Sequence, residues 1–144
     1  MSDDGAARAR ALALLKQHGW NATSFQILEP GFRYWFAPGA GGEDTAGGDA
    51  ACVGYVDTGA AWIAAGAPVA ADPALASVAE AFVAAARAAG RRAAFFATEE
   101  RLALDPALAG LTALRIGEQP VWDPAAWAAT VRSTRSLREQ LRRA

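Results

Sequence analysis

The sequence predicts a mixed α/β layer fold, in which helices flank a mixed central sheet that is antiparallel at its N-terminal side. Three observations support this prediction. Helical and strand-like segments alternate along the chain, two short β runs flank a hairpin signal, and one long amphipathic helix joins two strands. With 144 residues, of which 53% are hydrophobic, the chain has the size and composition of one globular domain.

The N-terminal part predicts one helix, a bent connection and one strand. The helix runs from Gly5 to Gln17 and ends at Gly19, since glycine favours the left-handed turn that follows a helix. Residues 20–25 follow no clear period and predict a loop. The aromatic run at residues 32–36 predicts a strand, because aromatic residues fit a pleated, half-buried surface.

The middle of the chain predicts a β-hairpin after a flexible connection. Residues 38–49 are rich in glycine but lack the Gly-Lys-Ser/Thr ending of a phosphate-binding loop, so we expect only a link between strands. Two β runs follow at residues 52–56 and 61–65. The Asp57-Thr58-Gly59 sequence between them is typical of a tight turn.

The clearest helix of the chain starts at Asp72-Pro73 and ends at Gly90. Its apolar residues recur at helical spacing and form one stripe, which predicts burial of that face: Leu75, Val78, Ala79, Phe82, Val83 and Ala86. The run at residues 91–97 then predicts a strand that enters the core. A helix between two strands of one sheet predicts that these strands are parallel.

The C-terminal part predicts a short helical turn from Asp105, a strand over residues 111–116, a helix capped by Asp123 and a last helix over residues 133–143. We predict a domain at residues 1–131 that contains the sheet. A basic amphipathic helix follows it at residues 132–144.

Charge and cysteine content exclude several classes of protein. A net charge of −1 excludes a binder of nucleic acid that is basic over its whole surface. A single cysteine, Cys52, and a single histidine, His18, exclude an internal disulfide and a zinc cluster, and we expect no metal and no cofactor. Cys52 is expected to be an inert buried thiol, and His18 a cation at a helix C-terminus. Without a signal peptide or transmembrane segment, we expect a cytoplasmic protein.

The junction between the second β run of the hairpin and the long helix contains Gly66-Ala67-Pro68. An acyl-coenzyme A enzyme of this layout would present several backbone N–H groups to a pyrophosphate at this point. Pro68 has no N–H, and Gly66 alone is conformationally permissive. We therefore expect no binding of acetyl-coenzyme A.

Four arginines near the C-terminus recur at spacings of three and four residues, which predicts one basic stripe on one helix: Arg132, Arg135, Arg138 and Arg142. Val131, Leu137 and Leu141 form the apolar side of the same helix. Such a charge asymmetry favours an anionic partner, which could be lipid phosphate, RNA or an acidic protein surface. The alternative is a terminal helix that is merely solvated.

Several segments together resemble one known family. They are residues 19–28, 32–36, 53–56, 66–69, Phe82 with 90–92 and 95–96, residues 115–118, and the final arginine and leucine helix. The chain from residue 8 to residue 143 resembles the C-terminal cytosolic domain of the phosphatidylglycerol lysyltransferases, the multiple peptide resistance factors. The residues of this sequence that match the family motifs are Asn21, Ser24, Phe25, Gln26, Gly66, Pro68, Gly117 and Glu118.

The resemblance implies a GNAT-like fold, the fold of acyl-coenzyme A N-acyltransferases, in the first of two tandem domains that a basic helix joins. It implies a bacterial enzyme that moves an amino acid from aminoacyl-tRNA to phosphatidylglycerol at the inner face of the membrane. The family's chemistry is assigned mainly to the second domain, so no catalytic residue is carried over to this chain. The missing half is expected from another chain or from self-association.

Three functions therefore stand as hypotheses. The first is half of a phosphatidylglycerol lysyltransferase-like aminoacyltransferase, in which activity requires a second GNAT-like domain. The second is a binding or regulatory module that has the fold without catalysis. The third is a stand-alone N-acyltransferase, against which the Gly66-Ala67-Pro68 junction argues.

Overall fold

The computed structural model describes residues 3–37, 50–102, 110–118 and 123–143. The chain divides into two compact units, one at residues 1–111 and one at residues 112–144. The domain boundary that the sequence places between residues 131 and 132 stays a prediction.

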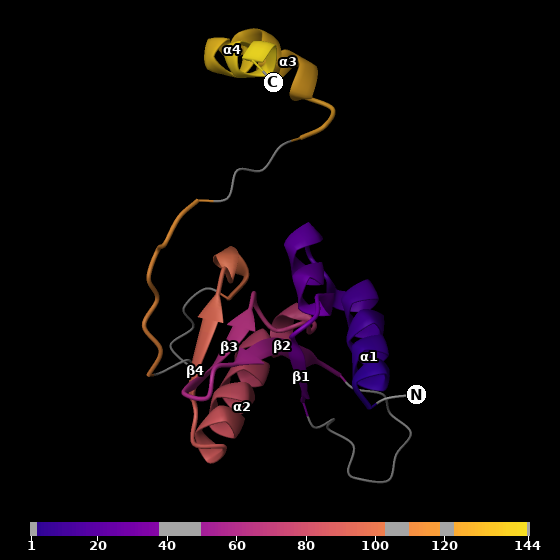
Figure 1. The fold of residues 1–144 in the computed structure, drawn as a ribbon, viewed down its shortest axis with the longest axis vertical. Coiled ribbons are helices and arrows are strands. Elements are labelled where there is room, and N and C mark those ends of the chain that lie inside the picture. Colours follow the sequence, from indigo (N-terminus) through magenta and orange to yellow (C-terminus); the bar gives the residue numbers. More distant parts are fainter. Residues whose placement is uncertain (1–2, 38–49, 103–109, 119–122, 144) are drawn as a thin grey trace. The chain divides into compact units, whose positions relative to one another are not determined.

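The described part of the first unit contains two helices, three short 3-10 helices and four strands (Figure 1). In chain order they are α1 (Asp3–His18), η1 (Ala22–Leu28), β1 (Arg33–Phe36), β2 (Cys52–Asp57), β3 (Ala61–Ala65), η2 (Asp72–Ala74), α2 (Leu75–Ala88), β4 (Arg92–Phe96) and η3 (Glu99–Leu102). The described part of the second unit contains α3 (Trp127–Ser133) and α4 (Arg135–Arg143).

The four strands form one mixed sheet in the order β1-β2-β3-β4. β1 and β2 pair antiparallel, with Trp35 opposite Val53, and β2 and β3 pair antiparallel, with Tyr55 opposite Ala64. β3 and β4 are parallel because α2 carries the chain back across the sheet. The predicted fold class is confirmed: helices flank a mixed sheet that is antiparallel at its N-terminal side.

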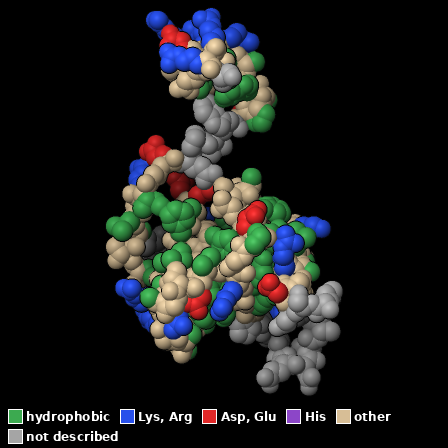
Figure 2. Space-filling model, in the orientation of Figure 1, with side chains coloured by type: hydrophobic (Ala, Val, Ile, Leu, Met, Phe, Trp, Pro, Cys, Tyr) green, Lys and Arg blue, Asp and Glu red, His purple; other side chains and the backbone are tan. Residues whose placement is uncertain are grey.

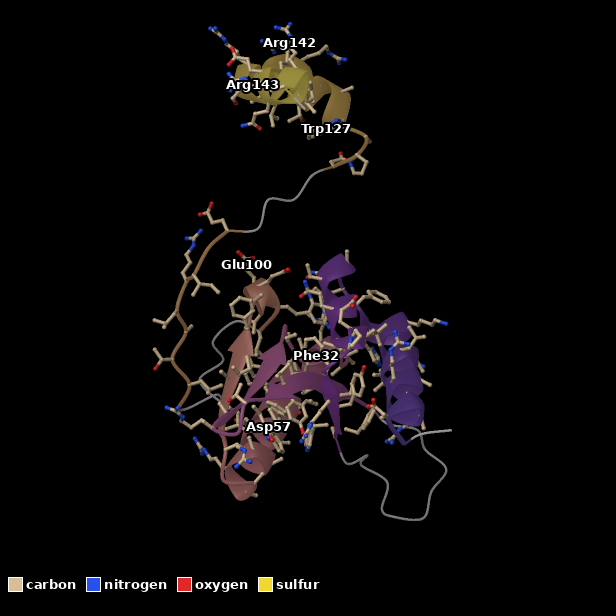
Figure 3. The ribbon with its side chains drawn as sticks, in the orientation of Figure 1. Phe32, Asp57, Glu100, Trp127, Arg142 and Arg143 are labelled. Atoms are coloured by element: carbon tan, nitrogen blue, oxygen red, sulfur yellow. The ribbon has the colours of Figure 1, made fainter. Side chains whose placement is uncertain are left out.

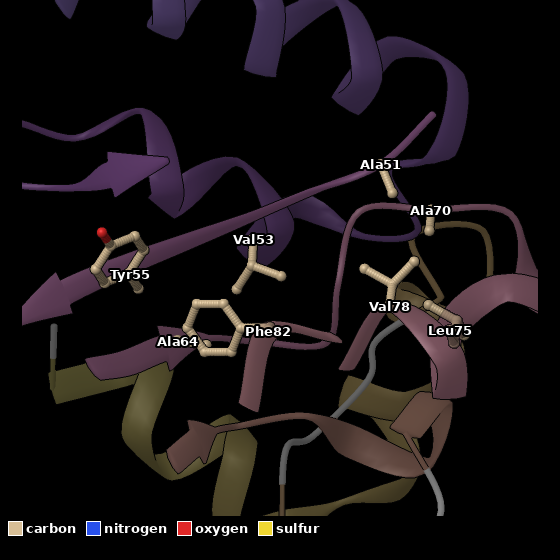
Figure 4. Packing of buried hydrophobic residues seen from close by; sticks show 8 residues of the cluster. All are labelled: Ala51, Val53, Tyr55, Ala64, Ala70, Leu75, Val78 and Phe82. Carbon is tan, nitrogen blue, oxygen red and sulfur yellow. The ribbon is translucent and has the colours of Figure 1, made fainter. Parts of the chain in front are cut away.

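One face of the sheet packs on α2 around Phe82, which is completely buried. Its ring contacts those of Trp35, Tyr55, Trp62 and Phe95, with centroids 5.5–5.8 Å apart. The stripe predicted for this helix is confirmed at its buried positions, several of which Figure 4 shows: Leu75, Val78, Ala79, Phe82 and Ala86. Aromatic side chains therefore build much of this core, which suits a helix that is otherwise rich in alanine.

The other face packs on α1 and η1 over β1 and β2. Its buried residues are Ala11, Leu14, Leu15, Ile27, Cys52 and Val69. Cys52 is completely buried, as the sequence predicts. At Gly54 a Cβ atom would lie 2.4 Å from the Cβ of Ile27, so only glycine allows η1 to approach β2 this closely. Farther along this face, Val56, Ile63 and Phe96 remain exposed.

The predicted hairpin between β2 and β3 is confirmed, and Asp57 organises it. Its Oδ1 accepts hydrogen bonds from the Gly59 N–H at 2.8 Å and from Arg91 Nε at 3.2 Å. Arg33 Nη1 lies 3.7 Å from Oδ2. The Gly59 N–H and then the Arg91 guanidinium hold the pKa of Asp57 below its usual value.

We expect Asp57→Asn to lower the urea midpoint of unfolding at about pH 7 and to have little effect near pH 2. The pKa is depressed in the folded state. The charged carboxylate therefore stabilises the fold above its unfolded pKa of about 4, and this contribution disappears as the pH falls through the folded value. Urea titrations of both proteins across this range measure it. A difference that stays constant with pH would contradict the charged role.

Three sequence predictions are corrected by the structure. Residues 20–25 were expected as a loop, but Ala22–Leu28 forms η1, whose short 3-10 turns leave no 3.6-residue period to detect. Residues 111–116 were expected as a strand, but they have no strand partner among the described residues, and Leu114 is 78% exposed. The last helix begins at Arg135 and is separated from α3 by the extended backbone of Thr134.

Two further expectations concern parts of the chain outside the described residues: the glycine-rich connection at 38–49 and the turn that starts at Asp105. No helix among the described residues is long and apolar enough to span a bilayer. Within the same part of the chain, no group of three or more histidine, cysteine or acidic residues is placed to hold a metal ion.

Candidate functional site

A cleft of about 330 Å³ lies at the carboxyl ends of the parallel strands β3 and β4. Its walls come from the end of α1, the loop after β3 and the 3-10 helix after β4. The lining residues are Gln17, His18, Gly19, Trp20, Ala70, Ala71, Asp72 and Arg101. Open sheets with parallel strands commonly bind ligands outside these strand ends. This position makes the cleft the candidate site of the first unit.

Arg101 is held in place by three contacts at the wall of the cleft. Its Nη1 lies 2.8 Å from Asp72 Oδ1, and its Nη2 donates to the Ala70 carbonyl at 3.0 Å. Its guanidinium carbon lies 4.7 Å from the centroid of the Trp20 ring. Only 17% of the Arg101 side chain is exposed, although the carboxylate partner is 78% exposed. A planar guanidinium fixed in this way offers directed N–H groups rather than a mobile charge.

Two N–H donors in this cleft are buried and lack an acceptor among the described residues: Trp20 Nε1 and Arg101 Nε. A buried donor without a partner is unfavourable by about 1–3 kcal/mol. Gly66, with φ of +77°, packs against the Trp20 ring. A Cβ atom there would lie 3.2 Å from the ring. Both N–H groups are buried, so they lie beneath the surface of the cleft rather than on it.

The turn after β4 is strained. Ala97 and Glu99 are non-glycine residues with positive φ values of 57° and 55°. Glu99 Oε1 accepts a hydrogen bond from Asn21 Nδ2 at 2.7 Å, which ties this turn to the segment before η1. Positive φ in such residues is unfavourable by about 1–3 kcal/mol and is often found at functional sites. The strained turn leads directly into η3, which carries Arg101.

The family-motif residues occupy different places, and their roles stay predictions. Asn21 caps η1, since its Oδ1 accepts from the Ser24 N–H at 2.8 Å, and Ser24 is buried. Gly66 lies against Trp20 at the cleft, and Pro68 is fully buried beside the same loop. Four others are exposed: Phe25, Gln26, Gly117 and Glu118. Glu118 pairs with Arg115 in the second unit.

The junction after β3 uses its N–H groups internally. The Gly66 N–H donates to the Phe96 carbonyl at 2.7 Å, and the Val69 N–H donates to the Cys52 carbonyl at 2.9 Å. Pro68 has no N–H. β3 and β4 also stay paired up to Ala65 opposite Phe96, so no gap opens between them. Few backbone donors remain here for a pyrophosphate.

We therefore expect acetyl-coenzyme A to show no binding at micromolar concentrations in isothermal titration calorimetry. The reason is that the donors of the strand–helix junction are occupied or absent. Gly66→Val serves as the specificity control, because a side chain there would collide with Trp20. Micromolar binding that Gly66→Val abolishes would contradict this expectation.

The structure corrects the predicted single stripe of arginines in the second unit. Arg132 lies on α3, whereas Arg135, Arg138 and Arg142 lie on α4. Arg138 is half-buried and donates from Nη1 to the carbonyls of Val131 and Arg132, which are among the last of α3. It therefore joins the two helices instead of facing outward.

The remaining arginines of α3 and α4 are exposed. Arg135 pairs with Glu139 at 2.9 Å, one helical turn later. The side chains of Arg142 and Arg143 extend from the end of α4 (Figure 3). Arginine side chains gather on one side of this helical unit, and hydrophobic ones on the other (Figure 2). The unit is thus amphipathic, as the sequence predicts, although two helices build it.

Sequence reasoning did not single out Trp20 and Arg101 at the cleft, the contact of Asp72 with Arg101, or Glu99 in the neighbouring strained turn. Asp72 was identified only as the start of a helix. One signal was available, because Glu99 and Arg101 directly follow a strand that a helix connects in parallel to its neighbour. His18, expected only as a helix-end cation, also lines the cleft.

The lining of the cleft suits binding and positioning rather than covalent catalysis. It contains N–H donors, one carboxylate and one imidazole, but none of the eight lining residues is a serine, threonine, cysteine or lysine that could act as a nucleophile. Such a site can orient a substrate, and it can accept a proton from a hydroxyl through Asp72 or His18.

The fold and this site define a class of protein: a single GNAT-like α+β domain with a polar cleft at the ends of its parallel strands. The family model described as phosphatidylglycerol lysyltransferase, C-terminal, matches residues 12–144. The chain therefore belongs to this family, as its motifs predict. Searches of curated proteins and of solved structures find no match.

Proposed function

We propose that this chain is one half of a phosphatidylglycerol lysyltransferase-type aminoacyltransferase and requires a second GNAT-like domain for activity. The family match over residues 12–144 is the observation that supports the reaction type. The cleft supports the need for a second domain, since its lining can position a substrate but contains no nucleophile. Aminoacyl-tRNA is the proposed donor, and the glycerol hydroxyl of phosphatidylglycerol is the acceptor.

The chemistry of this reaction fits such a site. The aminoacyl ester of tRNA is already activated, so transfer to a hydroxyl requires alignment of the two reactants and removal of one proton. The hydroxyl oxygen attacks the ester carbonyl, the 3′-terminal oxygen of the tRNA leaves, and the hydroxyl proton passes to a base. In this chain, Asp72 and His18 are the groups at the cleft that can hold that proton.

The amphipathic second unit supports a peripheral position on the inner face of an anionic membrane. Its exposed arginines are suited to lipid phosphates, and Leu141 is 54% exposed on the same helix. We propose Arg132, Arg135 and Arg142 as lipid-facing residues. The sequence also predicts this role for Arg138, which in the structure binds α3 carbonyls.

A second candidate is a binding or regulatory module that has this fold without catalysis. The observation in its favour is the same lining, which contains no nucleophile. A stand-alone N-acyltransferase is not favoured, since the strand–helix junction has few free N–H groups.

The test is transfer of a radiolabelled amino acid from charged tRNA to phosphatidylglycerol vesicles. It compares the purified chain alone with the chain joined by a GNAT-like domain that co-purifies with it from its host. We expect transfer only when the chain and the co-purifying domain are both present. Transfer by the chain alone would overturn the half-domain proposal, and its absence with every co-purifying partner would favour the binding module.

A further inference from the structure

We propose that residues 97–101 form a movable strap at the wall of the cleft, and that the hydrogen bond between Glu99 and Asn21 is the latch that holds it closed. The closed strap lays the Arg101 side chain over the Trp20 ring, and its release opens this wall to solvent. The inference concerns access to the cleft, so it goes beyond the proposed function and does not depend on it.

The strap is a short segment between two anchors. Before it, the Phe96 carbonyl accepts a hydrogen bond from the Gly66 N–H at 2.7 Å, which ties the end of β4 to the loop after β3. After it, Leu102 packs against the core cluster that contains Phe82. The residues between these anchors can therefore change conformation while the sheet and α2 keep their places.

Backbone strain favours the open form of the strap. In the closed form, Ala97 has φ of 57° and Glu99 has φ of 55°, in the left-handed region that favours glycine. None of the residues 97–101 is a glycine. Because an open strap allows both residues to return to ordinary backbone angles, opening relieves this strain.

Hydration of two buried donors favours the open form as well. The guanidinium carbon of Arg101 lies 4.7 Å from the centroid of the Trp20 ring. In this arrangement Trp20 Nε1 and Arg101 Nε are buried and have no acceptor among the described residues. Water can bind these N–H groups once the Arg101 side chain leaves the ring, so closure is unfavourable for both donors.

A few side-chain contacts near the surface hold the strap closed. Arg101 pairs with Asp72 at 2.8 Å and donates to the Ala70 carbonyl at 3.0 Å. The ion pair contributes little, because 78% of the Asp72 side chain is exposed. Glu99 Oε1 accepts from Asn21 Nδ2 at 2.7 Å. Since so few contacts oppose the strain, the loss of one should raise the population of the open form measurably.

Asn21 is suited to hold the strap because its own side chain is fixed. Its Oδ1 accepts from the Ser24 N–H and from Thr23 Oγ1, both at 2.8 Å. These bonds determine the orientation of the amide and direct its Nδ2 toward Glu99. Asn21 also follows Trp20 directly in the chain, so the latch and the covered ring belong to one segment.

The experiment measures hydrogen exchange of the Trp20 indole N–H in the full chain by ¹H–¹⁵N NMR, and Trp20→Phe identifies the signal. This N–H is buried in the closed form, so its exchange rate reports the open population. Asn21→Ser removes the donor to Glu99 but keeps an oxygen that can cap η1. We expect Asn21→Ser to speed exchange about fivefold. Ala97→Gly, which relieves strain, should slow it about threefold.

Matched controls separate release of the strap from general unfolding. Glu99→Gln keeps an oxygen acceptor without the charge, so it should speed exchange less than Asn21→Ser does. Glu100→Gln changes the exposed neighbouring acid on η3 (Figure 3) and should exchange like the parent. Trp62 Nε1 is also buried, on the face of the sheet that packs on α2, so its exchange should stay the same in each variant.

Three results would overturn the proposal. An unchanged Trp20 rate in Asn21→Ser would show that the strap does not depend on this hydrogen bond. If Asn21→Ser fails to fold, an unchanged rate in Glu99→Gln leads to the same conclusion. Equal acceleration at Trp20 and Trp62 would show unfolding of the whole unit instead of opening of the strap. Exchange that Ala97→Gly does not slow would remove the role of backbone strain.

Discussion

Replacement of the arginines exposed on α3 and α4 by glutamine is expected to weaken binding to phosphatidylglycerol vesicles about a thousandfold. The variant changes Arg132, Arg135, Arg142 and Arg143 together. Each basic residue near an anionic surface contributes about 1 kcal/mol, so four contribute about 4 kcal/mol if their effects add. Glutamine preserves the length and helix propensity of the side chain while it removes the charge. Co-sedimentation with vesicles measures the affinity.

Salt dependence and two further variants sharpen this prediction. Parent binding should fall as ionic strength rises, because the charges are exposed. The same positions changed to lysine should bind nearly as the parent does. Arg138→Gln should instead loosen the junction of α3 and α4, since Arg138 donates to α3 carbonyls. Equal binding of parent and glutamine variant would show that the basic side of these helices is only solvated.

Phe82→Ala is expected to lower the free energy of unfolding of the first unit by about 3–5 kcal/mol. Phe82 is completely buried between α2 and the sheet and contacts four aromatic rings, so its removal leaves a cavity that these large rings cannot fill. Urea unfolding followed by circular dichroism measures the change.

The matched control is Phe96→Ala on β4, because Phe96 is 59% exposed on the opposite face of the sheet. We expect it to change the free energy of unfolding by less than about 1 kcal/mol. Similar losses for the two variants would contradict the central position of Phe82. Both phenylalanines lie in apolar segments of the sequence, and only their burial separates them.

The order of elements was predictable because local chemistry determines it. Asp57-Thr58-Gly59 favours a tight turn between two β runs. Asp72-Pro73 marks the start and Gly90 the end of a helix whose apolar stripe is buried against the sheet. A hairpin joins antiparallel strands and a helical crossover joins parallel ones, so their succession predicts a mixed sheet. The family was predictable as well, since its motifs are short and contiguous in the sequence.

The strand predicted at residues 111–116 is wrong, and the same kind of pattern could not reveal this. Alternating apolar residues such as Leu114 and Ile116 indicate a strand only when a neighbouring strand pairs with them, and the described residues provide none. The break at Thr134 is a similar case. Helical spacing extends through it, and the contact of Arg138 with α3 carbonyls is visible only in three dimensions.

The sequence by itself determined the layers, the hairpin, the buried face of α2 and the amphipathic C-terminal helices, because each depends on neighbours within a few turns of chain. Only the tertiary structure decided the candidate site. Trp20 and Arg101 are far apart in the sequence, and they meet because α1 and β4 end at the same edge of the molecule. Local periodicity and propensity cannot predict this contact, since it depends on packing between segments that are distant in the sequence.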